Sequence, residues 1–267
     1  MEAAFVEANY TVDYAHYLQH HRLVNHAAGV LAGKAQAMVL DLGCSQGINL
    51  FALHRKLLRD AIRYMGIDLD RAALVRAANR CAYRGYTNIE FKVGDVLRTS
   101  LPAGSADLIL SSEVIEHLRE PRVLLEEIRR VLAPGGIALI TTPNLSNYPR
   151  RAGDWVDRRL NGGLRKRAYA GMVDRGPGSG FSPEEAAGIL GHVSEKPAKA
   201  WRELAQELEF DVQLRRGSTL VYGYPWLARH PMLFGLLCLA DGLLELTPWW
   251  YDTSHDLFMV LRKRTTG

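Results

Sequence analysis

The sequence predicts an α/β fold in which a mostly parallel sheet is covered by helices on both faces. From about residue 37 to residue 144, short β-branched or apolar runs alternate with longer helical patterns. The helical patterns place apolar residues three or four positions apart, as one buried helix face requires. Strands that alternate with helices of this length are typical of a parallel sheet, because each helix carries the chain back to the start of the next strand.

The strands and helices of this core follow in a regular order. The strands are expected at AMVLDLG, IRYMGIDLD, NIEFKVGDV, ADLILSS and GIALITTPN. The helices between them are expected at GINLFALHRKLLRD, RAALVRAANRCAYRG and EPRVLLEEIRRVLAPGG. Pro134, Gly135 and Gly136 are expected to stop the third helix and turn the chain into the next strand.

We expect three regions of a single domain. Residues 1–36 should form an N-terminal helical cap, and residues 37–146 the ligand-binding core. Residues 147–267 should contain basic and apolar insertions, a helix at KPAKAWRELAQELEF and closing strands at FDVQLRRGS and HDLFMVLRKR. With these two strands the prediction becomes a Rossmann-like, seven-stranded mixed sheet.

The composition is that of a soluble α/β domain. The chain has 267 residues, of which 48% are hydrophobic and 23% charged. The chain has three cysteines, and this odd number argues against a disulfide framework. Their spacing is not that of a metal site. The first residues lack the basic-then-apolar order of a secretory signal, so we expect a cytoplasmic location.

Two insertions of opposite character bear on the partner. Residues 150–175 contain eight basic and three acidic residues, which indicates contact with something anionic. Residues 225–250 are strongly apolar, but Gly235, Asp241 and Glu245 keep them short of the roughly 20 consecutive apolar residues that span a bilayer. This apolar segment could be a lid over the acceptor, a surface resting on a membrane, a dimer interface or core helices covering the sheet.

Glycines and acids fall at the ends of the predicted strands. The loop of residues 43–47, here named the glycine loop, ends the first strand and opens the first helix. Asp68 and Asp95 end the second and third strands. Ligands of such sheets bind outside the carboxyl ends of the strands. A dinucleotide fingerprint needs glycine at the first, third and sixth places of the loop. Counted from Gly43 as the first, the third place is Ser45 and the sixth is Ile48, so an NAD-dependent enzyme is excluded.

The stretch from Val39 to Asn144 resembles the class I S-adenosylmethionine-dependent methyltransferases. Their loop reads acid-x-Gly-x-Gly-x-Gly, and Ser45 replaces the middle glycine here. Serine takes a positive φ less cheaply than glycine, so we expect a slightly reshaped loop or a hydroxyl contact with the ligand. The resemblance implies that the loop cradles the methionine moiety and that Asp68 binds the ribose hydroxyls. It also implies that Leu69 packs on the adenine and that the Asp95 carboxylate contacts the adenine amino group. The implied cofactor-binding residues are Asp41, Gly43, Ser45, Gly47, Asp68, Leu69, Gly94, Asp95, Val96 and Ser111.

The stretch SSEVIEHL is the expected catalytic segment, because Glu113, Glu116 and His117 lie within one turn if a helix starts there. His117 could be a general base or could orient an acceptor hydroxyl. Alternatively, the three side chains and His192 could hold a divalent cation, since the pattern resembles ubiquinone-pathway O-methyltransferases and small-RNA 2′-O-methyltransferases. They could also be ordinary residues of a half-exposed helix. We assign Glu113, Glu116 and His117 as catalytic and assign no metal ligand.

The expected function is methyl transfer from S-adenosylmethionine to a small-molecule acceptor, at an oxygen. The basic and apolar insertions together suit an amphipathic acceptor, lipid-like or anionic. One alternative is a metal-assisted RNA 2′-O-methyltransferase, but a net charge of +4 is weak for a polyanion partner, so nucleic acid is not the expected partner. Another is a non-catalytic, cofactor-binding protein. Peripheral membrane contact stays open, and the sequence predicts no oligomeric state.

Overall fold

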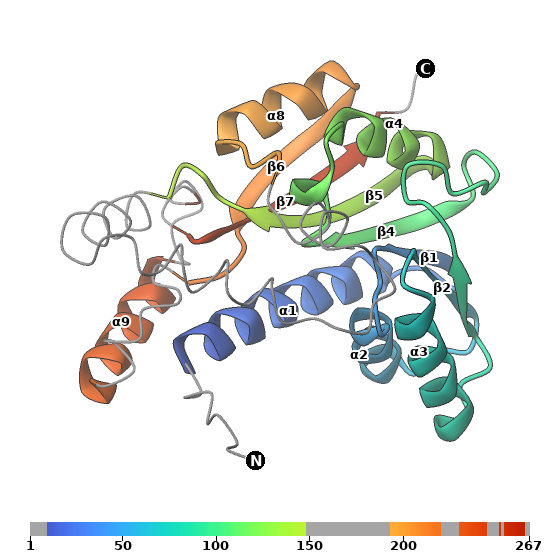
Figure 1. Cartoon of the computed structure of the whole chain (residues 1–267), viewed down its shortest axis with the longest axis horizontal. Helices are drawn as coiled ribbons and strands as arrows, with labels where there is room; N and C mark the ends of the chain where they lie inside the picture. The colour runs from blue at the N-terminus through green and yellow to red at the C-terminus, as the bar shows by residue number, and fades with distance from the viewer. Residues whose placement is uncertain (1–9, 148–192, 220–229, 245–250, 252–253, 265–267) are drawn as a thin grey trace, which may run out of the picture.

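A seven-stranded sheet with helices on both faces forms the fold (Figure 1). The computed structural model describes residues 10–147, 193–219, 230–244, 251 and 254–264. The strand order is β3-β2-β1-β4-β5-β7-β6, and β7 alone runs antiparallel to its neighbours β5 and β6. The strands are β1 (Ala37–Leu42), β2 (Ile62–Asp68), β3 (Ile89–Val93), β4 (Ala106–Ser112), β5 (Leu132–Pro143), β6 (Phe210–Arg216) and β7 (Asp256–Lys263).

The helices lie in two layers. In Figure 1, α4 and α8 cover one face of the sheet, and α1, α2 and α3 lie on the other side. Neighbouring strand residues point to opposite faces, so Leu40 of β1 joins the cluster under α4 and α8, whereas Val39 joins the cluster under α1 and α2. The described helices are α1 (Tyr10–Leu31), α2 (Ile48–Leu57), α3 (Arg71–Arg84), the 3-10 turn η1 (Ile115–His117), α4 (Pro121–Val131), α8 (Ala198–Glu207) and α9 (Pro231–Leu244).

The predicted α/β fold class is confirmed, and every predicted core strand and helix is present. One boundary was wrong. The third core helix, α4, ends at Val131 and β5 begins directly at Leu132, so Pro134, Gly135 and Gly136 lie inside the strand. The pairing of β4 with β5 shifts between Ala106 and Leu108, where β5 accommodates these extra residues as an irregularity.

The insertions that the sequence singled out are only partly described. Residues 150–175, which hold the excess of basic side chains, lie outside the described residues, as does His192. Of the apolar segment, the described part is α9, which leaves Met232, Leu236, Leu239 and Leu243 exposed. Their spacing of three or four places them on one side of the helix, so this side is not part of the sheet's core. None of the helices in the described part of the chain is long and apolar enough to cross a membrane.

Candidate active site

The glycine loop takes a backbone that side chains would block. Gly43 and Gly47 have φ values of +75° and +73°, in the left-handed region. A Cβ on Gly43 would lie 2.3 Å from Cγ2 of Val114, and one on Gly47 would lie 2.5 Å from Cζ of Phe91. Both positions therefore need glycine for its conformation and for its small size.

Ser45 holds the middle position of the loop without abandoning the left-handed backbone. Its φ is +45°, and its amide N–H donates to Oδ2 of Asp68 over 2.7 Å. A left-handed conformation costs an L-residue about 1–2 kcal/mol. The hydrogen bond that Ser45 donates to Asp68 offsets part of this cost and ties the loop to the end of β2.

The ends of β2 and β3 present an acid, an apolar side chain and a second acid. Oδ1 of Asp68 accepts from the N–H of Asp70 over 2.8 Å, while Leu69 between them is 56% exposed. Asp95 is exposed, and its Oδ1 accepts from the N–H of Leu97 over 2.9 Å. The next residue, Val96, is buried, so its side chain belongs to the core under α4. Gly94 donates its N–H to the carbonyl of Asp68 over 3.0 Å and thereby holds the two strand ends together.

Asp41 and Ser111 lie below this surface. Both side chains are fully buried, and neither Oδ1 of Asp41 nor Oγ of Ser111 has a hydrogen-bond partner among the described residues. Burial raises the pKa of Asp41 to about 8, a shift that Asn49 opposes and Asp68 reinforces. A positive charge placed beside Asp41 would lower this pKa, because an opposite charge favours the ionised carboxylate.

The end of β4 carries Glu113, the first of the predicted catalytic residues. Its φ is +55°, its N–H donates to the carbonyl of Thr141, and its Oε1 accepts from Nε2 of Gln19 over 2.6 Å. Burial raises its pKa well above the usual value, and the nearby carboxylates of Asp256 and Glu116 raise it further. Glu113 is thus a carboxyl group that keeps its proton to a higher pH than an exposed glutamate.

Glu116 and His117 occupy the single 3-10 turn η1, where the sequence had suggested the start of a helix. Glu116 is fully buried and accepts from Oγ1 of Thr142 over 3.2 Å. Nε2 of His117 lies 3.8 Å from Oε1 of Glu116, and the His117 side chain is 25% exposed. The turn is held from outside, because the carbonyl of Glu116 accepts from the N–H groups of Val193 and Ser194.

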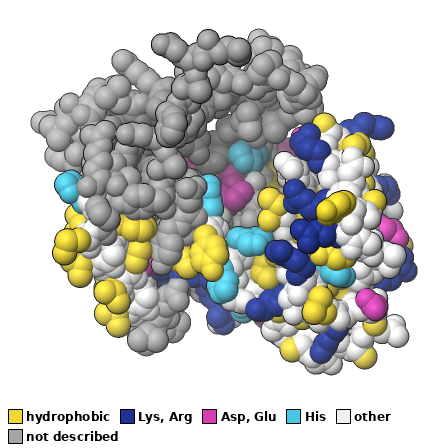
Figure 2. Space-filling view, turned by 90° about the horizontal axis from the view of Figure 1, so that it is seen from below, with side chains coloured by type: hydrophobic (Ala, Val, Ile, Leu, Met, Phe, Trp, Pro, Cys, Tyr) yellow, Lys and Arg dark blue, Asp and Glu magenta, His cyan; other side chains and the backbone are white. Residues whose placement is uncertain are grey.

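Sequence reasoning missed a His–Asp pair at the start of β7 and a glutamine on α1. Nδ1 of His255 lies 2.7 Å from Oδ1 of Asp256, and both side chains are nearly buried. Although burial raises the pKa of Asp256, the charge of His255 and hydrogen bonds from His255 and Ser218 hold it below the usual value. In Figure 2, acidic and histidine side chains gather in a hollow in the middle of one face. The sequence offered one signal for this pair, because Asp256 is an acidic residue at the start of a predicted strand.

The described residues contain no group of three or more His, Cys, Asp or Glu side chains that could hold a metal ion. His192, the suggested fourth ligand, lies outside them. The buried Glu116 carboxylate faces Thr142 and His117. The metal-assisted alternative therefore remains a prediction from the sequence.

Comparison with known proteins agrees with this geometry. Residues 34–173 match the family model described as "Methyltransferase domain". A probable S-adenosylmethionine-dependent methyltransferase of Mycolicibacterium smegmatis is 32% identical over 178 residues, which are 66% of this chain and 61% of that protein. A ubiquinone biosynthesis O-methyltransferase of Acinetobacter baylyi is 30% identical over 122 residues, covering 45% of this chain and 48% of that protein. The matches span less than two thirds of either relative.

A solved structure has the same fold. Phosphoethanolamine N-methyltransferase 2 of Haemonchus contortus, in complex with S-adenosyl-L-methionine, superposes with a TM-score of 0.57 and 17% identity. The superposition covers 92% of this chain and 53% of that chain. At this identity the likeness shows the fold alone.

Proposed function

The chain belongs to the class I S-adenosylmethionine-dependent methyltransferases, and on that premise we propose that it methylates an oxygen of a small, amphipathic acceptor. The methyl donor of this family is S-adenosylmethionine. One observation carries the acceptor side of the proposal: Glu113, Glu116 and His117 follow β4 directly, beside the strand ends that carry the glycine loop, Asp68 and Asp95. The relative from Acinetobacter baylyi, named as an O-methyltransferase, supports oxygen as the methylated atom.

The cofactor half of the site is built from the ends of β1, β2 and β3. We assign the methionine moiety to the glycine loop above buried Asp41, the ribose to Asp68, and the adenine to Leu69 and Asp95. The exposed side chains of Leu69 and Asp95 support this assignment, since an apolar surface and a hydrogen-bond acceptor are what an aminopurine needs. The bound cofactor supplies a methyl group already activated by its sulfonium.

The acceptor half must hold a hydroxyl in line with that methyl group and take its proton. Alignment alone can contribute about 7–11 kcal/mol. We assign the proton to His117, because the Glu116 carboxylate 3.8 Å from its ring favours the imidazolium that forms. In this role the His117 ring takes the hydroxyl proton, and the bound cofactor would supply the methyl group, with its sulfur as the leaving group. A general base of this kind contributes roughly 10²–10⁴-fold.

Glu113 has a different role in this proposal. Its raised pKa and its hydrogen bond from Gln19 support a carboxyl group that keeps its proton and positions the acceptor oxygen. Asp256 supports this protonation state, because its negative charge disfavours a second carboxylate nearby. Glu116 is a positioning residue, since it is fully buried and contacts His117.

The proposal is tested by trapping the methylated product. The full chain is incubated with S-adenosylmethionine carrying a deuterated methyl group and with fractionated cell extract, and labelled products are identified by mass spectrometry. We expect an O-methylated, amphipathic small molecule whose formation is lost in Asp68→Ala and reduced in His117→Asn. Label on nitrogen or carbon would overturn the acceptor atom. Calorimetry that shows no binding of S-adenosylmethionine to the folded chain would overturn the whole proposal.

The RNA alternative depends on residues 150–175, which lie outside the described residues, and it remains a prediction from the sequence. The same labelling experiment decides it, because RNA in the extract would then carry the label at ribose oxygens.

A further inference from the structure

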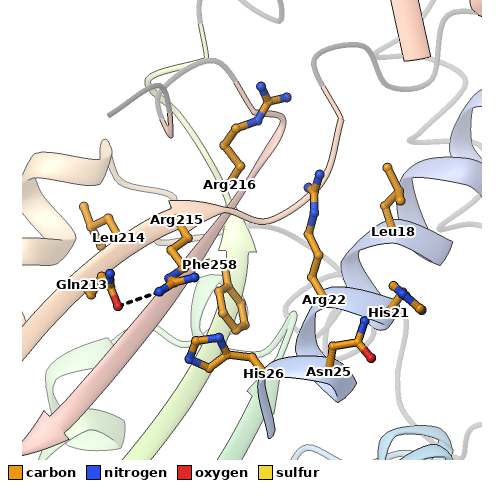
Figure 3. A pocket seen from close by; sticks show the side chains of 10 residues that line it. All are labelled: Leu18, His21, Arg22, Asn25, His26, Gln213, Leu214, Arg215, Arg216 and Phe258. Atoms are coloured by element: carbon orange, nitrogen blue, oxygen red, sulfur yellow. Dashed lines mark hydrogen bonds between the residues drawn. The ribbon is translucent and has the colours of Figure 1, made fainter. Parts of the chain in front are cut away.

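A cavity of about 600 Å³ lies between α1, the edge strand β6 and its neighbour β7 (Figure 3). Its volume falls within the roughly 300–1,000 Å³ of small-molecule sites. Three arginines, two histidines and two amides line it, and none of the described lining residues is acidic. The lining residues are Leu18, His21, Arg22, Asn25, His26, Gln213, Leu214, Arg215, Arg216 and Phe258.

Arg216 is a buried cation with spare donors. It is 7% exposed, and its single described ion-pair partner is Asp241 on α9. Neither Nε nor Nη1 of Arg216 has a hydrogen-bond partner among the described residues. A buried donor without a partner destabilises the folded protein, and more so when it is charged. A ligand with several acceptor oxygens would remove this cost.

Two further arginines line the same cavity, Arg22 of α1 and Arg215 of β6, and Arg215 leaves β6 on the opposite side from Arg216. Arg22 donates from Nη1 to the carbonyl of Ser218 over 2.6 Å, and Arg215 donates to Oε1 of Gln213 over 3.1 Å. In Figure 3, the side chains of Arg22 and Arg216 extend in the same direction from α1 and β6, whereas Arg215 turns toward Gln213. Three permanently charged arginines thus line the cavity, and the carboxylate paired with Arg216, that of Asp241, is not among the described lining residues.

The cavity adjoins the proposed acceptor half of the site through two elements. Arg22 follows Gln19, the partner of Glu113, by three positions and so shares its side of α1. Phe258 follows Asp256 by two positions on β7 and so points to the same face of the sheet. A ligand of moderate length could therefore reach from the His117 side into the arginines.

We propose that this cavity binds an oxyanion group of the methyl acceptor, a carboxylate or a phosphate. Planar guanidinium groups match both geometries with paired hydrogen bonds, which is why arginine is favoured for them. The inference rests on the proposed function and adds to it: the acceptor carries its methylated hydroxyl near His117 and its anionic group at Arg22, Arg215 and Arg216.

The test separates binding of the anion from binding of the cofactor. Calorimetry at constant ionic strength measures inorganic phosphate, benzoate and S-adenosylmethionine against the full chain. Two variants remove the cations. The first combines Arg22→Gln with Arg215→Gln, and the second combines Arg216→Gln with Asp241→Asn, so that no buried carboxylate is left alone. The control is Arg63→Gln, because Arg63 is an exposed arginine on β2.

We expect phosphate or benzoate to bind the wild type and the control, with at least tenfold weaker binding in both double variants and unchanged cofactor affinity. Whichever anion binds more tightly identifies the group. For the labelled acceptor, we expect the first variant to raise KM at least tenfold with kcat little changed. Equal anion binding in all proteins would overturn the inference while leaving cofactor binding intact. A lost anion site with an unchanged acceptor KM would also overturn it. Absent cofactor binding would instead count against the proposed function.

Discussion

The side-chain amide of Gln19 donates a 2.6 Å hydrogen bond to Oε1 of Glu113, which ties the N-terminal helix to the end of β4. Because Gln19 is buried, water cannot readily replace its side chain as the hydrogen-bond donor to Glu113. We expect Gln19→Leu to lower the free energy of unfolding by about 1–3 kcal/mol, because the Glu113 carboxyl group loses a buried partner. It should also lower kcat, because the acceptor-positioning group is no longer held.

Urea unfolding and steady-state kinetics check this prediction. The matched control is Gln206→Leu, since Gln206 is exposed on α8. If Gln19→Leu changed kcat no more than Gln206→Leu does, the link from α1 to the site would be structural only.

Gly43 should be intolerant of alanine for two separable reasons. The left-handed φ costs about 1–2 kcal/mol, and the new Cβ would also meet Val114 at 2.3 Å. We expect Gly43→Ala to weaken S-adenosylmethionine binding at least tenfold by calorimetry. Gly85→Ala is the control, because Gly85 has φ +68° but open space around its Cβ position.

Gly85→Ala should show the conformational cost in unfolding and leave cofactor affinity unchanged. Adding Val114→Ala to Gly43→Ala should restore part of the affinity. No restoration would mean that the contact with Val114 does not control the loop.

Replacing Ser45 by glycine should slightly increase the stability of the folded protein. Glycine relieves about 1–2 kcal/mol of left-handed strain but loses roughly 0.5–1 kcal/mol of backbone entropy on folding, so we expect Ser45→Gly to gain about 0.5 kcal/mol. Thermal unfolding measures this gain. Ser45→Ala keeps the strain and removes only the hydroxyl, so a loss of cofactor affinity in both variants would identify a contact from the hydroxyl.

Asp41 should make stability fall as the pH rises. Its pKa is about 8 in the folded protein against 3.8 for an ordinary aspartate, so between these values the folded state holds more protons than the unfolded state. Raising the pH from 5 to 8 therefore costs stability, by up to about 1.4 kcal/mol per pH unit. In Asp41→Asn this contribution is absent, and the difference from wild type should change progressively over that range.

Asp107→Asn is the control of opposite sign. Although burial raises the pKa of Asp107, its bonds from Lys34 and the N–H of Met38 hold it below the usual value. Its contribution to stability is present above pH 4 and is lost only on further acidification, so this variant should differ from wild type by a constant amount between pH 5 and 8. Parallel pH curves for Asp41→Asn and wild type would contradict the assignment of Asp41.

Turnover should survive removal of metals. The proposed base, His117, interacts with Glu116, and Glu116 is held by Thr142, so proton transfer needs no cation in this arrangement. We expect full activity in excess EDTA and a loss of about 10²–10⁴-fold in His117→Asn. Activity that disappears with EDTA and returns with a divalent metal would support the metal-assisted alternative.

The residues of the proposed cofactor half could be selected from the sequence because each of them belongs to a local pattern. Each residue stands at the end of a strand that hydrophobic periodicity identifies, and parallel strands bring their carboxyl ends to one edge. The selection of Asp41, Gly43 and Gly47 depended on the loop pattern alone and on no distant segment. The buried position of Val96 and the left-handed backbone kept by Ser45 were not accessible, because they depend on packing against β2 and α4.

The acceptor half was decided by tertiary structure. Gln19 comes from α1, the His255–Asp256 pair from β7, and Arg216 from β6, and no local pattern relates them to Glu113. Strand β7 inserts antiparallel between β5 and β6, which brings the start of β7 and the end of β6 to the edge where β4 ends. The sequence alone determined the fold class and the place of the glycine loop between β1 and α2, since periodicity and turn geometry are properties of neighbouring residues. The proposed acceptor surface required the folded chain, since burial and contacts between distant segments, such as the one between Gln19 and Glu113, which are 94 residues apart, exist only there.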